Sequence, residues 1–180
     1  MIKGFITNLG KYNEGELVGE WIEFPIDEEE LSEVLERIEI SSKENEDGIC
    51  YEEYFFTDWD IDYDCKFGEY ISIEEMNEIA ERCEVVERKG DVNALNSILE
   101  YQGNTLEEAL DTYEGGRFEY YDGYSLKSFA EELADDYLCG VIEDKRVRKF
   151  VQEHFDYDSY ADELDNEGYN ATETGIIIFC

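Results

Sequence analysis

Carboxylates are the side-chain groups in this chain that could most readily bind a metal ion or a charged partner. Residues 58–69 hold the most regular set of them. The segment reads DWDIDYDCKFGE, and positions one, three, five and twelve of a calcium-binding loop are all acidic in it: Asp58, Asp60, Asp62 and Glu69. A loop of that kind needs glycine at position six, where this chain has Tyr63. The preceding YEEYFFT also alternates like a strand, whereas a calcium loop follows a helix. A calcium-binding module that uses residues 58–69 therefore remains only an alternative interpretation.

The same residues fit a β-strand in which acidic and apolar side chains alternate. In that arrangement four carboxylates lie on one face, about 6.5–7 Å apart along the strand. Four acids in a row repel one another, and a face that is merely solvated would also contain Lys, Thr and Ser. We therefore expect a negatively charged partner-binding surface, with no bound metal, made here by Asp58, Asp60, Asp62, Asp64 and Glu69.

A second acidic set lies in a segment with helical periodicity. Like charges four residues apart cost a helix a few tenths of a kcal/mol, where a lysine would stabilise it by a similar amount. The chain has two such pairs in adjacent positions, which we assign to the same acidic surface: Glu131 with Asp135, and Glu132 with Asp136.

Other reactive side chains do not form a catalytic pattern. The only histidine, His154, shares a helical stripe with apolar residues, which predicts a half-buried packing role. Nucleophile, phosphate-loop and zinc-protease motifs do not occur, so we expect neither an enzyme nor a cofactor. The five cysteines are scattered without a C-x-x-C pair, which indicates reduced thiols and a cytoplasmic protein. The basic run at 145–149 suggests pairing with carboxylates of this chain or of a sister subunit.

The charge balance restricts the possible partners. The chain has 180 residues, with 49 Asp and Glu against 14 Lys and Arg, a formal net charge of −35. Such a field excludes nucleic acid and anionic membranes as partners and favours a basic surface such as a DNA-binding groove. Hydrophobic residues make up 42% of the chain, which is enough for folded cores. The sequence contains no stretch typical of a signal peptide or a membrane span.

Changes in hydrophobic period divide the chain into three parts and predict an α+β fold. Strands are expected at 2–9, 17–26 and 50–62, with a helix after Asp27, in a first domain at 1–70. Helices alone are expected in a central domain at 71–116. A third domain at 117–180 combines strands at 118–124 and 175–179 with helices from Ser125, at 144–155 and at 158–168.

The segment ITNLGKYNEGELVGEWIEFP, residues 6–25, closely resembles the opening signature of ArdA-type antirestriction proteins. The resemblance continues in YEEYFFTDWD, YISIEEMNEIAE, SLKSFAEELADD and FDYDSYADEL. It implies an elongated homodimer of three small domains in a row, with dimer contacts in the last domain. It also implies a protein of mobile genetic elements that mimics B-form DNA and binds the specificity and methyltransferase subunits of type I restriction–modification enzymes.

Elementary electrostatics is compatible with this resemblance. Duplex DNA carries one charge per about 1.7 Å of its axis, so 35 charges correspond to roughly 60 Å of duplex. A compact chain of this length would be only about 40 Å across. The charge therefore suits an extended molecule better than a sphere. The remaining alternative is an acidic, solvated domain without DNA-like geometry.

Overall fold

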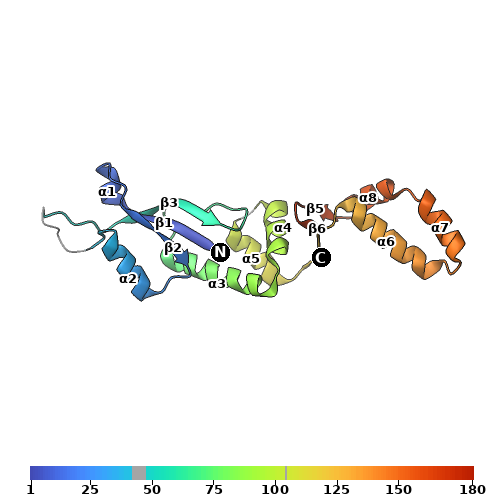
Figure 1. The fold of residues 1–180 in the computed structure, drawn as a ribbon, viewed down its shortest axis with the longest axis horizontal. Helices are drawn as coiled ribbons and strands as arrows, with labels where there is room; N and C mark the ends of the chain where they lie inside the picture. Colours follow the sequence, from blue (N-terminus) through green and yellow to red (C-terminus); the bar gives the residue numbers. More distant parts are fainter. Residues whose placement is uncertain (42–47, 104) are drawn as a thin grey trace. The chain divides into compact units, whose positions relative to one another are not determined.

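The computed structural model describes residues 1–41, 48–103 and 105–180. Within these ranges the chain forms eight helices and two antiparallel sheets of three strands each (Figure 1), which confirms the predicted α+β class. It divides into two compact units. The N-terminal unit contains Met1–Lys89 and Thr105–Glu107, and the C-terminal unit contains Gly90–Asn104 and Glu108–Cys180. None of the helices in the described ranges is long and apolar enough to cross a membrane.

The N-terminal unit is built on a sheet with the strand order β2-β1-β3. Its strands are β1 (Ile2–Asn8), β2 (Gly19–Phe24) and β3 (Tyr54–Ile61). The predicted hairpin of β1 and β2 is present, but a short helix, α1 (Leu9–Asn13), occupies the connection where only a turn was expected. The Asn8 side chain starts α1, because its oxygen accepts a hydrogen bond from the Lys11 backbone N–H at 3.0 Å.

Two helices, α2 (Glu28–Arg37) and α3 (Ile73–Lys89), lie along one side of this sheet (Figure 1). Both begin at side-chain caps: Asp27 accepts from Glu30 N–H at 2.8 Å and Ser72 from Glu75 N–H at 3.1 Å. The buried residues of β1, β2 and the two helices form the core of the unit: Ile2, Ile6, Ile22, Phe24, Val34, Met76, Ile79, Ala80, Cys83 and Val86. Met76, Ile79, Ala80 and Cys83 recur at helical spacing in the sequence, which predicts an apolar stripe, and their burial confirms it.

The C-terminal unit contains the second sheet, in the order β4-β6-β5. Its strands are β4 (Phe118–Asp122), β5 (Asn170–Ala171) and β6 (Gly175–Phe179). Helices α4 (Val92–Gln102) and α5 (Leu106–Gly115) precede the sheet in sequence. The buried Ser97 hydroxyl joins α4 to the β5–β6 turn through bonds to the Thr172 and Thr174 hydroxyls at 2.7 and 2.8 Å.

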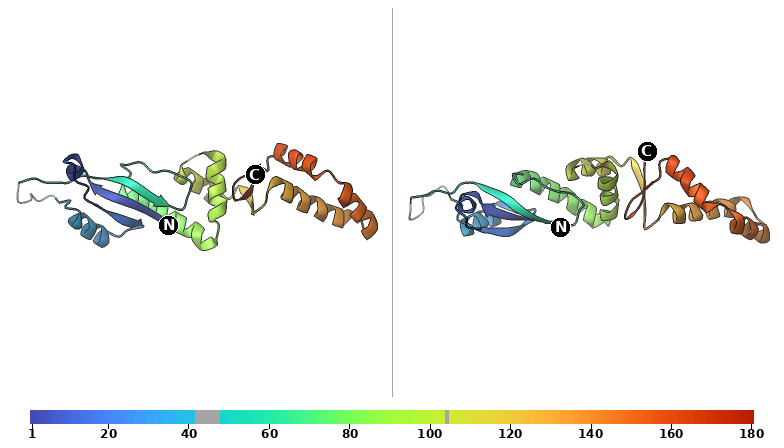
Figure 2. Two further views of the ribbon diagram at one scale, coloured as in Figure 1. Left: turned by 45° about the horizontal axis from the view of Figure 1, so that its top comes forward. Right: turned by 90° about the horizontal axis from the view of Figure 1, so that it is seen from above.

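Three further helices follow β4: α6 (Leu126–Val141), α7 (Lys145–His154) and α8 (Tyr157–Asn166). Helices α6 and α8 run side by side, and α7 connects their ends (Figure 2). Their core joins both helices to β6 through the buried residues Phe129, Ala130, Ala161, Leu164 and Ile176. The predicted boundaries between three domains stay a prediction.

Two residue-level expectations in this unit are wrong. Helical spacing from Phe129 and Ala130 predicts that Tyr137 lies on the same buried face of α6, but Tyr137 is 71% exposed. His154, predicted to be half-buried, is exposed and stacks on Phe150, with ring centroids 4.4 Å apart. Apolar residues of α7 are also exposed, including Val147 at 51% and Phe150 at 61%.

Candidate partner-binding surface

The strand β3 carries the first pair of predicted site residues, Asp58 and Asp60. Both carboxylates are exposed, whereas Trp59, which lies between them, and Ile61, which follows them, are partly buried. The predicted alternation of acidic and apolar positions is therefore present. Asp58 is oriented by a hydrogen bond that its carboxylate accepts from the Trp59 backbone N–H at 2.9 Å.

The register of the sheet places each of these acids in a transverse row, which is a set of paired residues that runs across the three strands. Asp58 pairs with Phe5 and Asp60 with Lys3, but Ile6 pairs with Phe56, so Thr57 is an extra residue in β3. Such a bulge bends and twists a strand. On β2, Trp21 lies opposite Phe5 and Glu23 opposite Lys3. We call the surface of these six residues the outer face of the sheet: Lys3, Phe5, Trp21, Glu23, Asp58 and Asp60.

The other three predicted acids of this segment lie outside the strand. Asp62 and Asp64 are exposed in the bend after β3, which ends at Ile61. Asp62 accepts a hydrogen bond from the Met1 ammonium group at 2.9 Å, which also donates to Glu87 at 2.6 Å. Burial alone would lower the pKa of this ammonium group, but its bonds to Glu87 and Asp62 raise the pKa above its ordinary value.

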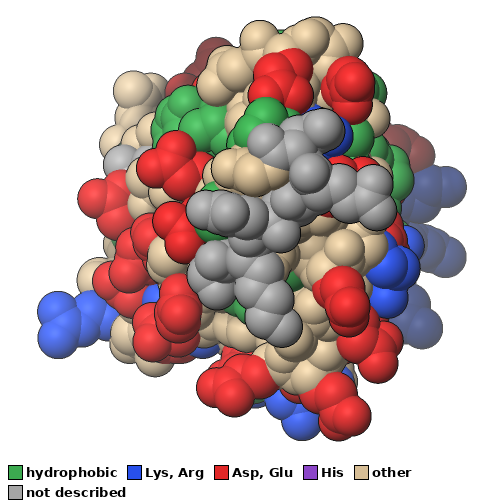
Figure 3. Space-filling view, turned by 90° about the vertical axis from the view of Figure 1, so that its left-hand side faces the viewer, with side chains coloured by type: hydrophobic (Ala, Val, Ile, Leu, Met, Phe, Trp, Pro, Cys, Tyr) green, Lys and Arg blue, Asp and Glu red, His purple; other side chains and the backbone are tan. Residues whose placement is uncertain are grey.

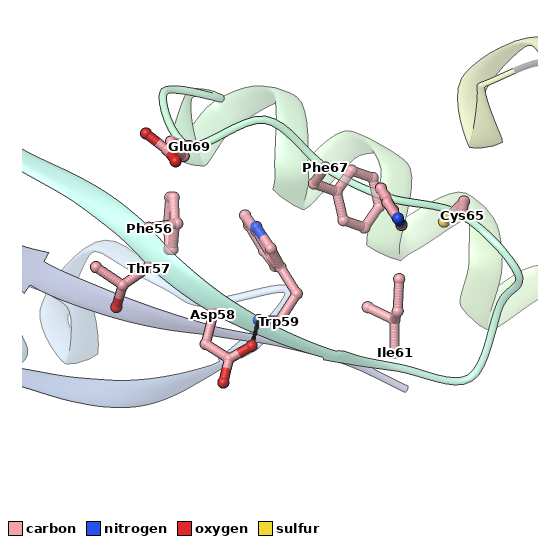
Figure 4. Close-up of a pocket in the computed structure, with 9 residues that line it drawn as sticks. Phe56, Thr57, Asp58, Trp59, Ile61, Cys65, Phe67 and Glu69 are labelled. Atoms are coloured by element: carbon pink, nitrogen blue, oxygen red, sulfur yellow. Dashed lines mark hydrogen bonds between the residues drawn. The ribbon is translucent and has the colours of Figure 1, made fainter.

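Glu69 is separated from Asp58 by the backbone of β3 (Figure 4). Trp59 and Phe56 point toward the same side as Glu69, whereas Asp58 points away from it. An open groove of about 380 Å³ lies between β3 and the following loop, with Trp59, Phe67 and Glu69 among its lining residues. Within the described residues no group of three His, Cys, Asp or Glu side chains is placed to hold a metal ion. Asp58 and Glu69 lie on opposite sides of β3, whereas the ligands of a calcium loop converge on one ion.

Thiol chemistry is also suppressed near this groove. Burial raises the pKa of Cys65 to about 11, and burial likewise raises the pKa of Cys83 to about 11. Both thiols therefore stay protonated at neutral pH and are weak nucleophiles. The groove offers a polar and aromatic surface.

The second predicted set lies on α6 of the C-terminal unit. Glu131, Glu132 and Asp136 are exposed, and Asp135 is partly buried. Glu132 accepts a hydrogen bond from the Tyr124 hydroxyl, and Asp135 accepts one from the Tyr157 hydroxyl at 2.9 Å. Tyrosine is a neutral donor, so these contacts orient the carboxylates while leaving their charge in place.

The basic stretch at 145–149 has a partly local role. Arg148 donates twice to the Ile142 carbonyl, at 2.6 and 3.1 Å, and so satisfies a backbone acceptor at the end of α6. Lys149 forms an ion pair with Glu153 at 3.7 Å on its own helix. The expected pairing of this stretch with carboxylates of the same chain is thus observed for Lys149.

One acidic residue of the outer face was missed by the sequence analysis. Glu23 alternates with the buried Ile22 and Phe24, and that pattern in GEWIEF was available as a signal. Acidic side chains are also spread widely over the face shown in Figure 3, where Lys and Arg side chains are fewer.

Comparison with known proteins places these features in a family. A family model described as antirestriction protein (ArdA) matches residues 4–178. This chain belongs to the ArdA antirestriction family. The match includes both units and both acidic sets, so the ArdA resemblance of the N-terminal hairpin holds for nearly the whole chain. A search of curated proteins finds no match.

The ArdA assignment gives the acidic surface a biological context. Antirestriction proteins counter restriction systems, whose enzymes bind DNA, and a DNA-binding groove is lined with Lys and Arg. An ArdA protein that presents ordered carboxylates carries the charge complementary to such a groove.

Proposed function

We propose that this protein inhibits type I restriction–modification enzymes by mimicking B-form DNA in the groove of their specificity and methyltransferase subunits. The observation that carries the proposal is the presence of ordered, exposed carboxylates on rigid elements of both units: β3 in one and α6 in the other. Carboxylates held in this way can take the places of phosphates against Lys and Arg. The protein acts by occupying the groove, in the cytoplasm of the cell that harbours a mobile element, and no bond is made or broken.

A competition assay tests the proposal directly. A type I methyltransferase core is bound to a fluorescent duplex that carries its recognition site, and this protein is added at low and at high salt. We expect displacement of the duplex at near-stoichiometric protein, and weaker displacement at high salt because ion pairs are screened. Enzymes with different recognition sequences should be inhibited alike, because phosphate contacts carry no base information. The absence of displacement at both salt concentrations would favour the acidic, solvated domain.

Charge reversal on the outer face tests whether the position of the acids matters. Asp58→Lys with Asp60→Lys changes two exposed carboxylates, and we expect a modest loss of inhibition, about tenfold, because the remaining acids still engage the groove. The matched control is Glu52→Lys with Glu53→Lys, which makes the same change in net charge at exposed residues before β3. Complete loss of inhibition would contradict a distributed surface, and equal losses in both variants would show that only net charge matters.

The proposed assembly is a homodimer, consisting of an elongated row of three domains in each subunit, with its contacts in the C-terminal unit. Exposed apolar side chains on α6 and α7 support it: Tyr137, Val141, Val147 and Phe150. A neighbouring cavity of about 390 Å³ is lined mainly by apolar groups, including Leu138 and Phe155. The exposed Lys145, Arg146 and Lys149 on α7 fit a partner as acidic as a second copy of this chain.

Sedimentation of a Val147→Glu, Phe150→Glu variant tests the dimer. Because both side chains are exposed in the single chain, the variant should fold and sediment as a monomer while the unaltered protein sediments as a dimer. Leu17→Glu, at a residue that is 66% exposed in the N-terminal unit, serves as the control and should remain dimeric. A dimeric double variant would move the contacts away from α7.

A further inference from the structure

An exposed aromatic pair lies within the acidic outer face of the N-terminal sheet. Trp21 is 45% exposed and contacts Phe5 edge-to-face, with ring centroids 5.4 Å apart and planes at 70°. On β2 the neighbouring Ile22 and the more distant Phe24 are buried, so the core does not require Trp21. Polar and apolar residues otherwise alternate between the two faces of this sheet. A large indole that is exposed on the polar face is available to bind a partner.

The backbone next to the pair holds it in place. A Cβ atom at Gly19 would lie 2.7 Å from Cε1 of Phe5 and 2.6 Å from the Ile6 carbonyl oxygen, so the Phe5 ring fits only because Gly19 has no side chain. Phe5 in turn limits the orientation of Trp21 through the edge contact. The indole face is therefore largely ordered before any partner arrives, which reduces the entropy lost on binding.

The groups around the pair carry a net negative charge. One transverse row consists of Glu23, Lys3 and Asp60, and the next consists of Trp21, Phe5 and Asp58. Lys3 forms an ion pair with Glu23 at 3.4 Å. The outer face thus holds three carboxylates and one ammonium group together with an exposed indole.

This combination suits a guanidinium group better than an ammonium group. Guanidinium is flat, weakly hydrated and able to stack on an indole while its N–H groups bond to carboxylates. A lysine ammonium is compact and strongly hydrated, so it loses more by leaving water.

We propose that Trp21, supported by Phe5, with Glu23 two residues along β2 and with Asp58 and Asp60 two strands away on the same face, is an arginine-binding site. Its occupant is an arginine side chain of a DNA-binding groove. The inference rests on the proposed function, because it is charge complementarity with such a groove that selects the occupant. It adds a specific aromatic contact to an otherwise distributed electrostatic surface.

Intrinsic fluorescence with simple peptides tests the site without a restriction enzyme. The protein is titrated with octa-arginine and, separately, with octa-lysine, and Trp21→Phe is used to subtract the signal of Trp59. We expect the Trp21 signal to change at an octa-arginine concentration at least about fivefold below that of octa-lysine. Equal responses to the two peptides, or no response from Trp21, would overturn the proposal.

The DNA-displacement assay, repeated with variants of this protein, provides a second test of the site. Trp21→Leu keeps apolar bulk without the π face and should weaken displacement of DNA about 3- to 30-fold, whereas Trp21→Phe should retain most of it. Tyr12→Leu is the control, because Tyr12 is 50% exposed and also makes an edge contact, with Phe55 at 5.1 Å, outside the outer face. Unchanged inhibition by Trp21→Leu would overturn the inference, as would a changed oligomeric state, which would show that a second copy covers this face.

The two tests also separate this inference from the proposed function. If the unaltered protein does not displace DNA but Trp21 still prefers octa-arginine, the arginine site stands and DNA mimicry fails. If displacement occurs and neither test involves Trp21, mimicry stands and the arginine site fails.

Discussion

At the scale of single residues, the absence of a side chain determines where aromatic rings lie on the N-terminal sheet. A Cβ atom at Gly4 would come within 2.8 Å of both Phe56 and Trp59, whose rings pack over β1 on the inner side of the sheet. Those two rings are themselves 4.5 Å apart, centroid to centroid. Gly4 thus lets Trp59 pack inward, which in turn keeps Asp58 and Asp60 on the outer face.

Substitution of Gly4 by alanine should therefore destabilise the N-terminal unit. We expect a decrease of about 1–3 kcal/mol in the free energy of unfolding, because rings of the core must shift to accommodate the methyl group. Urea unfolding monitored by tryptophan fluorescence measures the change. Gly68→Ala is the control, since no atom lies within 4 Å of a Cβ at that position. Similar stabilities for the two variants would contradict the close packing of β1 against Phe56 and Trp59.

At the scale of elements, tyrosine hydroxyls hold many of the carboxylates in place. The chain has 14 Tyr, as many as its Lys and Arg together. Hydroxyl donors reach acids in both units, for example Tyr51 to Glu14 at 2.8 Å and Tyr121 to Glu119 at 2.6 Å. These bonds order an acidic side chain and preserve its charge, which a lysine partner would cancel. Under the proposed function, such bonds keep the surface negative for a basic partner.

The tyrosine–carboxylate bonds predict a loss of stability in alkali. The bond to Glu119, together with burial, raises the pKa of Tyr121 to about 12, and burial with a bond to Asp91 raises the pKa of Tyr113 to about 12. Unfolded tyrosine titrates near 10. Between these values the unfolded chain binds fewer protons than the folded protein, so stability is complete below about pH 10 and falls as the pH rises toward 12.

Thermal unfolding measured between about pH 9 and pH 12 checks this expectation. Tyr121→Phe removes one of the titrating groups, so its stability should decline less steeply across that window than the stability of the unaltered protein. A decline of the same slope in both proteins would assign the alkaline transition to other groups.

At the scale of the whole molecule, the net charge of −35 acts in opposite directions on folding and on binding. Repulsion among the acids opposes the compact state, and added salt screens it. The same screening weakens ion pairs with a basic partner. Salt should therefore stabilise the fold while it reduces inhibition.

The unfolding midpoint should rise by several degrees between about 0.05 and 1 M NaCl, over which the Debye length falls from roughly 14 to 3 Å. Calorimetry at neutral pH measures the increase. Repetition near pH 4, where many carboxylates are protonated, is the control and should give a smaller increase. An increase that is as large at pH 4 would point to a cause other than charge repulsion.

Local patterns in the sequence predicted the α+β class, most helices and strands, the start of a helix after Asp27, and the alternation of acidic and apolar residues from Asp58 to Ile61. These features depend on neighbouring residues only, because side-chain period and capping act within a few positions along the chain. The family also followed from sequence, through the segment at 6–25, and the match over residues 4–178 confirms it.

Only the tertiary structure decided which residues share a surface. Strand register placed Trp21, Phe5 and Asp58 in one row, and a bulge at Thr57 set where β3 faces outward. In the bend after Ile61, Asp62 accepts a hydrogen bond from the Met1 ammonium group. The loop that follows places Glu69 on the opposite side of β3 from Asp58. The exposure of Tyr137 and His154 likewise could not be read from helical period alone. Contacts between residues distant in sequence set these outcomes, and periodicity along one segment does not contain that information.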